Sequence, residues 1–239
     1  MSAKRILDIA VSLVALAVSA PILGGAMLLI WAEDGHSPLY RATRVGRGDR
    51  DFRMIKLRSM HIDAESQGGT STALSDQRVT SVGKLLRRSK LDELPQFWNV
   101  LIGDMSVVGP RPNTRRGGVD NYTREEMRLL AVRPGVTDLA SIVFSDEGNI
   151  LDGADDPDEL YDAIIRPWKS RLGLLYTERS TIAADMKIVI LTVVAAFAKR
   201  PALRGVDSIL DRWGASADLR RICRRRVPLL PADPPGVMA

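Results

Sequence analysis

Two adjacent carboxylates, Asp92 and Glu93, have the residue types and the setting for phosphate chemistry. They stand at an expected helix start near Pro95, with Arg87 and Lys90 just upstream. Nearby cations keep a carboxylate ionised, as a nucleophile or a magnesium ligand must be. Magnesium takes one or two carboxylates and completes its shell with substrate phosphates. On its own such a pair is more often a helix cap, so the chemical interpretation depends on its neighbours.

Other residues narrow the chemistry further. Arg111 lies between two prolines and is a candidate for a bidentate phosphate contact. A single cysteine, Cys223, excludes an internal disulfide and a multi-cysteine metal site, and only His36 and His61 are available for a histidine site. Carboxylates and a hard cation therefore remain as the expected catalytic resource.

The net charge of +5 suits a partner that carries phosphate, which includes nucleic acid, anionic lipid and nucleotides. A nucleic-acid-binding protein would need base-stacking aromatic residues among its basic residues. The chain has four Phe, four Tyr and four Trp, and they do not cluster in its arginine-rich end. We therefore expect no nucleic-acid partner.

The elements that must position these residues begin with an apolar run from Ile9 to Ala32, long enough to span a bilayer. A cleavable signal peptide is disfavoured because the acidic pair Glu33 and Asp34 follows in place of a cleavage site. An ordinary spanning helix is disfavoured because basic residues flank the run on both sides. Both flanks then prefer the cytoplasm.

A segment that enters the membrane, turns and returns satisfies both flanks. Pro21 lies near the middle of the run, where it would break a helix, and Ser19 or Ser12 would bond the freed carbonyls. We expect a re-entrant membrane helix, broken at Ser19 and Pro21, on the cytoplasmic face of the membrane.

The remainder predicts an α/β fold that is mostly helical. Strands at 39–45 and 52–57 form a hairpin around Gly46 to Asp49, and 62–77 is expected to be a loop. Helices are expected at 82–88, from 93–95 onward, at 123–132 with a Thr123/Glu126 capping box, and at 158–165, 171–181 and 188–198. The predicted organisation is an anchor at 1–36, a catalytic domain at 37–200 and a basic, proline-rich tail at 201–239. Its basic part is expected to contact anionic lipids, and its proline-rich end to be unstructured.

Several motifs occur in order along the chain. They include Leu-Asp-Glu-Leu-Pro-Gln-Phe-Trp-Asn-Val-Leu from 91, Gly-Asp-Met-Ser-Val-Val-Gly-Pro-Arg-Pro from 103, Arg-Met-Ile-Lys-Leu-Arg-Ser-Met from 53, Arg-Pro-Gly-Val-Thr from 133 and Asp-Met-Lys-Ile from 185. With Lys4, Arg5 and Asp8 ahead of the apolar run, this set resembles the bacterial sugar transferases, the monotopic polyprenyl-phosphate phosphoglycosyl transferases. The resemblance covers roughly residues 4–200.

The resemblance implies a magnesium-dependent reaction in two steps at the cytoplasmic face of the bacterial inner membrane. Asp92 would attack the sugar-bearing phosphate of a UDP-sugar and release UMP, and undecaprenyl phosphate would then take the sugar phosphate from the aspartyl intermediate. The product would start a surface glycan such as an exopolysaccharide, O-antigen or capsule. The particular sugar, and whether the chain forms a homodimer, stay open.

The resemblance also implies roles for individual residues. Glu93 would hold Mg²⁺, Arg87 would meet the lipid phosphate, and Asp185 matches an acidic position near the active site. The residues expected to bind substrate phosphates are Lys56, Arg58, Arg111 and Arg133. Two departures from the family pattern are Ala20, where a serine is usual, and Ser145, where an arginine is frequent. A scaffold without activity is the rival interpretation, and the intact Asp92–Glu93 pair and Arg111 argue against it.

Overall fold

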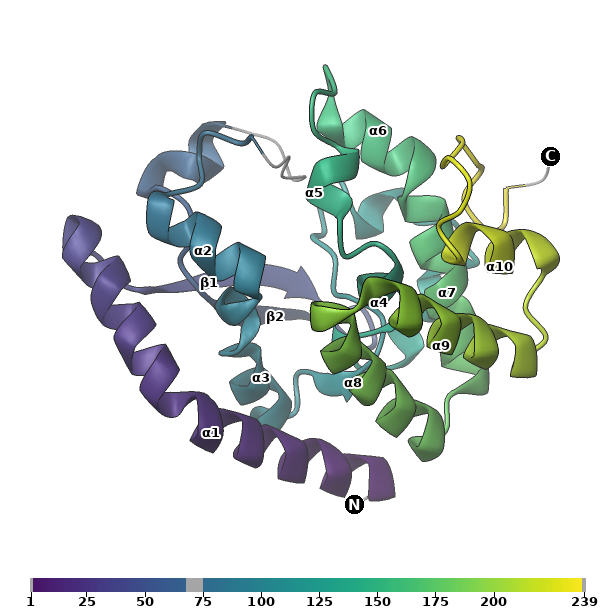
Figure 1. Ribbon diagram of the computed structural model, residues 1–239, viewed down its shortest axis with the longest axis horizontal. Coiled ribbons are helices and arrows are strands. Elements are labelled where there is room, and N and C mark those ends of the chain that lie inside the picture. The colour runs from purple at the N-terminus through teal and green to yellow at the C-terminus, as the bar shows by residue number, and fades with distance from the viewer. Residues whose placement is uncertain (1, 68–74, 238–239) are drawn as a thin grey trace.

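The computed structural model describes residues 2–67 and 75–237. Short strands and a body of helices lie on one side of a long N-terminal helix, α1 (Figure 1). The prediction of a mostly helical fold with a β-hairpin is confirmed. Of the loop expected at 62–77, residues 68–74 lie outside the described part, and Ile62–Gln67 forms a 3-10 helix, η1.

Helix α1 (Ala3–Asp34) contains the whole apolar run and is long and apolar enough to cross a membrane by length and composition. Pro21 lies inside it, and Figure 1 shows that the helix bends near its middle. Proline removes the amide that would bond the carbonyl four residues earlier, here that of Ala17. Ser19 Oγ contacts a different carbonyl, that of Leu16, at 3.5 Å, which is long for a hydrogen bond.

The hairpin is formed by β1 (Leu39–Val45) and β2 (Asp51–Leu57), paired antiparallel so that Leu39 faces Leu57. A second, unpredicted pair is parallel and consists of β3 (Ser106–Val108) and β4 (Gly135–Thr137). At Gly135 a Cβ would lie 2.2 Å from the Gly109 amide nitrogen, so only glycine permits this close approach.

The predicted helices are present, with one correction in helix type. They are α2 (Ser81–Ser89), α3 (Gln96–Ile102), α6 (Pro157–Ile164), α7 (Arg166–Arg179) and α8 (Ile182–Phe197), and two short ones, α4 (Leu139–Val143) and α5 (Glu147–Ile150), were not predicted. The stretch at 123–132 forms 3-10 helix, η4 (Glu126–Ala131), after another short one, η3 (Val119–Asn121). Its predicted capping box exists, since Thr123 and Glu126 exchange two hydrogen bonds.

The C-terminal region packs on the domain. Helix α9 (Lys199–Arg212) places Ala202, Val206 and Leu210 in the main core without any exposed surface, and helix α10 (Ala217–Cys223) adds Cys223. The proline-rich end, expected to be unstructured, forms no helix or strand but is bonded to the domain. The carbonyls of Pro235 and Asp233 accept hydrogen bonds from Thr123 Oγ1 (2.5 Å) and Arg171 (2.8 Å).

The start of α1 is fixed to the domain by three side chains. Arg5 donates to the carbonyls of Val100 (2.5 Å) and Leu101 (2.7 Å), and Asp8 accepts from Ser106 Oγ (2.9 Å) and the Val107 amide (3.0 Å). Lys4 Nζ lies 2.6 Å from Asp185 Oδ2 on α8. We call these contacts, with Tyr176 beside Asp185, the α1 root.

Candidate active site

Asp92 and Glu93 lie in a tight 3-10 turn, η2 (Leu91–Glu93), between α2 and α3. Lys90 ends α2 in the left-handed region with φ 59°, and Leu94 and Pro95 have right-handed helical angles. Pro95 suits a helix start because its missing amide has no partner there in any case. The chain therefore runs helically from the carboxylate pair into α3.

Glu93 is held by two cations from distant segments. Arg111 donates to both of its carboxylate oxygens at 2.7 and 2.6 Å, and Lys56 Nζ on β2 lies 3.3 Å from Oε1. Arg111 follows β3 and also donates to the carbonyl of Val136 on β4 at 3.0 Å. The hairpin thus places Lys56, and the β3–β4 pair places Arg111, beside the same carboxylate. Arg111 contacts it in the bidentate geometry that arginine prefers.

The pKa values of this group follow from burial and charge. Burial opposes ionisation of Glu93, but Arg111 and Lys56 outweigh it and hold the pKa of Glu93 well below its usual range. Burial lowers the pKa of Lys56 against the attraction of Glu93. The opposite balance holds at Arg111, where Glu93 outweighs burial and raises the pKa. Glu93 is therefore an ionised carboxylate held between two cations.

Asp92 has a different environment. It is 7% exposed, and its Oδ1 has no hydrogen-bond partner among the described residues. Burial raises the pKa of Asp92; Lys56 opposes this shift and the neighbouring Glu93 adds to it. A buried polar atom without a partner costs about 1–3 kcal/mol. The fold therefore bears a cost at Asp92 that it avoids at Glu93.

Arg87 lies beside this pair at the end of α2. Its Nε donates to Ser59 Oγ at 2.8 Å, and α2 approaches Ser59 so closely that a Cβ at Gly83 would lie 2.0 Å from the Ser59 carbonyl oxygen. Burial lowers the pKa of Arg87, and the negative charge of Asp92 opposes that shift. We call Lys56, Arg87, Asp92, Glu93 and Arg111 the carboxylate centre.

Three predicted site residues have other partners. Arg58 forms a fork with Asp34 at 2.5 and 2.6 Å and so fastens the C-terminal end of α1. Arg133 donates through Nε to the carbonyl of Gly103 at 2.8 Å. Asp185, 2% exposed, belongs to the α1 root. Their contacts hold elements together and lie apart from the Glu93 contacts.

Gln96, the first residue of α3, was not predicted as a site residue. It has no exposed surface, yet neither its amide oxygen nor its amide nitrogen has a hydrogen-bond partner among the described residues. A polar residue about one helical turn after Asp92 was the available signal.

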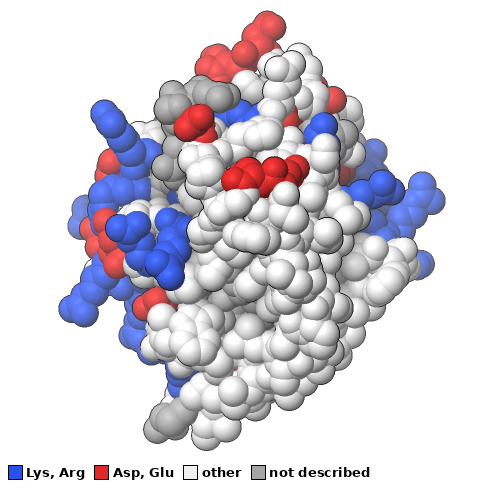
Figure 2. Space-filling view, turned by 90° about the vertical axis from the view of Figure 1, so that its left-hand side faces the viewer, with Lys and Arg blue, Asp and Glu red and all other residues white. Residues whose placement is uncertain are grey.

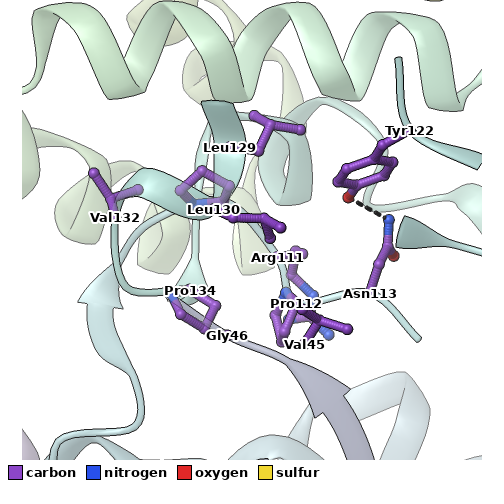
Figure 3. Close-up of a pocket in the computed structure, with 11 residues that line it drawn as sticks. Val45, Gly46, Arg111, Pro112, Asn113, Tyr122, Leu129, Leu130, Val132 and Pro134 are labelled. Carbon is purple, nitrogen blue, oxygen red and sulfur yellow. Dashed lines mark hydrogen bonds between the residues drawn. The ribbon is translucent and has the colours of Figure 1, made fainter. Parts of the chain in front are cut away.

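A small pocket lies beside Arg111, between the end of β1 and residues 129–134 (Figure 3). Asn113 donates to the Tyr122 hydroxyl on its wall at 2.9 Å, and burial raises the pKa of Tyr122 to about 12. Its volume of about 10 Å³ holds no more than a water molecule. A nucleotide sugar therefore does not fit in this pocket.

These features define a mostly helical domain on a long apolar helix, with a carboxylate–cation centre suited to phosphate chemistry. The family model described as bacterial sugar transferase matches residues 1–199. The chain belongs to the bacterial sugar transferase family.

The relatives it matches carry consistent names. A UDP-N-acetylgalactosamine-undecaprenyl-phosphate N-acetylgalactosaminephosphotransferase from Aeromonas hydrophila is 42% identical over 59% of this chain and 34% of its own length. A UDP-glucose:undecaprenyl-phosphate glucose-1-phosphate transferase from Caulobacter vibrioides is 41% identical over 58% of this chain and 53% of its own. The exopolysaccharide production protein PSS of Rhizobium leguminosarum is 37% identical over 80% of this chain and 94% of its own. The chain therefore spans less than two thirds of the first two relatives.

Proposed function

We propose that this protein transfers a sugar 1-phosphate from a UDP-sugar to undecaprenyl phosphate and releases UMP. The observation that carries the proposal is the carboxylate centre, in which an unpaired Asp92 adjoins a Glu93 held by Lys56 and Arg111. The names of the Aeromonas and Caulobacter relatives supply the substrate class. The order of the two steps is the one that the resemblance to the family implies.

In the proposed first step, a carboxylate oxygen of Asp92 attacks the phosphorus that bears the sugar. The bond between this phosphorus and the bridging oxygen breaks, and the oxygen leaves with UMP. In the second step, an oxygen of undecaprenyl phosphate attacks the same phosphorus, and the bond to Asp92 breaks. The aspartate is regenerated, and the product is a polyprenyl-diphospho-sugar.

Lys56 and Arg111 would bind the diphosphate by exchanging partners. In the contacts described above both cations neutralise Glu93, and a diphosphate offers them more negative charge in the same place. Arg87 uses Nε to bond Ser59, and its other guanidinium donors, which make no hydrogen bond among the described residues, would meet the lipid phosphate.

Magnesium is part of the proposal because the donor set suits it. No cluster of three or more His, Cys, Asp or Glu residues that could hold a metal occurs in 2–67 and 75–237. Magnesium needs only one or two carboxylates when substrate phosphates complete its shell, and Glu93 beside the unpaired Asp92 oxygen meets that need. When bound there, Mg²⁺ would neutralise charge on the diphosphate.

We also propose that α1 is a re-entrant anchor on the cytoplasmic face of the inner membrane. Figure 2 shows the face on the α1 side, whose centre and lower part are free of charged side chains; basic side chains, with acidic ones among them, lie along its left edge, and more basic side chains lie at its right. More than half of the residue surface is exposed at Ile6, Leu13, Val14, Val18, Ile22, Leu28, Leu29 and Trp31 of α1. A second exposed apolar stripe on α8 consists of Ile182, Met186, Ile190, Val193 and Phe197. Such surfaces are typical of membrane contact, and the basic edge suits anionic lipids.

Cysteine labelling tests this topology. Cys223 has no exposed surface, so Ala3→Cys and Ser37→Cys, at exposed positions on either side of the apolar run, each add one reactive thiol. We expect an impermeant maleimide to label both positions in inverted membrane vesicles and neither in spheroplasts. Labelling of the two positions from opposite sides would show a straight span instead.

UMP release tests the reaction. The assay supplies UDP-glucose or UDP-N-acetylgalactosamine, Mg²⁺ and undecaprenyl phosphate to the parent and to Asp92→Asn. We expect release by the parent alone, and a radiolabelled sugar phosphate trapped on the parent when the lipid is omitted. Equal release by both proteins would remove Asp92 as the nucleophile.

A further inference from the structure

Gln96 is buried in a way that packing does not explain. It has no exposed surface, and both polar atoms of its amide lack hydrogen-bond partners among the described residues. Leaving a buried donor and acceptor unpaired costs free energy that an apolar residue of the same size avoids. A residue selected only to fill this space would be leucine or methionine.

Asn99 on the same helix shows the ordinary case. It too has no exposed surface, but its Oδ1 accepts from the Ile55 amide at 2.9 Å and its Nδ2 donates to the Arg53 carbonyl at 2.8 Å. These bonds fasten α3 to β2. Helix α3 therefore does pair its buried amides where their role is structural.

Gln96 and Asp92 lie about one helical turn apart. The chain runs from Asp92 in the 3-10 turn η2 (Leu91–Glu93) through Leu94 and Pro95 into α3, which begins at Gln96. Side chains of a helix lean toward its N-terminus, which directs the Gln96 amide toward the turn that carries Asp92. Asp92 Oδ1 also lacks a hydrogen-bond partner among the described residues. An amide donor and a carboxylate acceptor, both buried and both without partners in this part of the chain, therefore lie about one turn apart on one helical segment.

We propose that Gln96 is a positioning residue whose amide nitrogen donates to Oδ1 of Asp92 when the UDP-sugar is bound, leaving the other oxygen free to attack. The inference rests on the proposed function, in which Asp92 is the nucleophile. A carboxylate that attacks through one oxygen gains rate when its rotation is restricted, because fewer orientations are then unproductive.

Gln96→Met tests the role of the amide, since methionine has similar length and no amide. We expect its thermal midpoint to equal or exceed that of the parent. We expect kcat for UMP release to fall about 10- to 100-fold, while KM for the UDP-sugar stays within about twofold, because Lys56 and Arg111 are unchanged. Without lipid, the labelled intermediate on Asp92 should form more slowly by the same factor.

Asn99→Leu is the matched control on the same helix. It removes paired hydrogen bonds and is expected to lower the thermal midpoint, which Gln96→Met does not. If Gln96→Met lowers the midpoint and leaves kcat unchanged, Gln96 is structural and the proposal is wrong. Gln96→Leu replaces Gln96→Met if the latter fails to fold.

The assay separates the two proposals. A parent that forms the labelled intermediate, together with a Gln96→Met variant that forms it equally fast, overturns the role of Gln96 alone. A parent that releases UMP with one of these UDP-sugars and lipid but forms no intermediate without lipid, or an Asp92→Asn variant that forms the intermediate, overturns the proposed nucleophile and the role of Gln96 with it.

Discussion

The α1 root and the carboxylate centre are both buried polar clusters, but they differ in how completely their atoms are paired. In the root, both carboxylate oxygens of Asp8 accept hydrogen bonds, and so do both oxygens of Asp185. In the centre, Asp92 Oδ1 has no hydrogen-bond partner within 2–67 and 75–237, and neither polar atom of Gln96, four residues later, has one there. Similar residue types therefore carry different costs in the two regions.

This difference in pairing indicates that the α1 root serves stability and the carboxylate centre serves the reaction. In a fully paired cluster the hydrogen bonds offset the free-energy cost of burying the polar groups, so no ligand is needed to explain it. An unpaired one is retained only if something else compensates, and a bound substrate is the simplest compensation. We therefore expect substitutions in the root to change stability, and substitutions at Asp92 and its neighbours to change the reaction.

The largest effect is expected at Asp92. Asp92→Asn should reduce UMP release at least about a thousandfold, as removal of a covalent nucleophile does. Burial raises the pKa of Asp92, so its charge destabilises the folded state above the ordinary aspartate pKa of about 3.9. Thermal unfolding at pH 7 should therefore show an unchanged or higher midpoint for Asp92→Asn.

Glu93→Gln is the matched comparison for Asp92→Asn. It leaves the half-buried charges of Lys56 and Arg111 without their carboxylate, so its thermal midpoint should fall. If both variants lost stability to the same extent, the contrast between the two carboxylates would be wrong.

The next effect is expected in the root, at Asp185. Asp185→Leu leaves Lys4 and the Tyr176 hydroxyl without their shared acceptor. Because Lys4 is about a third exposed and can turn to water, we expect a loss of about 2–3 kcal/mol in unfolding free energy. Denaturant titration in detergent measures this loss. UMP release per folded molecule should stay near the parent value, and a selective loss of activity would assign Asp185 to the reaction.

The sequence predicted the elements whose signals are local. The hairpin follows from two alternating stretches around a glycine-rich turn, and the Thr123–Glu126 box from two residues three apart. The β3–β4 pair was not predicted because each strand has three residues, too few for a periodic pattern. The C-terminal end was misjudged because its bonds go to residues far away in the sequence.

For the site, too, the sequence indicated the residues but not all of their partners. Asp92, Glu93, Lys56 and Arg111 are brought together, and the motifs indicated them. Arg58 and Arg133 have the same residue type as Arg111, but their partners are Asp34 and the Gly103 carbonyl. Partner choice depends on the three-dimensional packing, and so does the lack of partners at Gln96.

Substitutions of two arginines are expected to have an intermediate effect on kcat/KM, and they test whether Arg111 binds substrate phosphate. Arg111→Lys keeps the charge and loses the fork that holds both oxygens of Glu93. We expect kcat/KM for the UDP-sugar to fall about 10- to 100-fold, mainly through KM, in steady-state UMP release. Arg133→Lys is the control, because Arg133 contacts only a backbone carbonyl in the hydrogen bonds described, and its kcat/KM should stay within about threefold. Equal losses in both variants would contradict the assignment of phosphate binding to Arg111.

The smallest effect is expected from Tyr176→Phe, which removes one hydroxyl from the root. That hydroxyl donates to Asp185 Oδ1 at 2.7 Å, and burial together with the Asp185 charge raises the pKa of Tyr176, so it stays protonated. One net hydrogen bond is worth about 1 kcal/mol, or about 2–4 °C in a domain of this size. Differential scanning fluorimetry measures the shift, and UMP release should not change.

Tyr176→Phe is also the most sensitive test of whether the α1 root and the carboxylate centre act independently. The root and the centre share β3, since Asp8 binds Ser106 and Val107 while Arg111 follows the same strand three residues after Val108. Lys4 and Tyr176 of the root also contact the Val108 carbonyl on β3, so a disturbance of the root would reach Arg111 through β3, whose pairing with β4 opposes movement. If Tyr176→Phe lowered kcat/KM by more than about threefold, β3 would couple the membrane helix to substrate binding, and the two clusters would act as one.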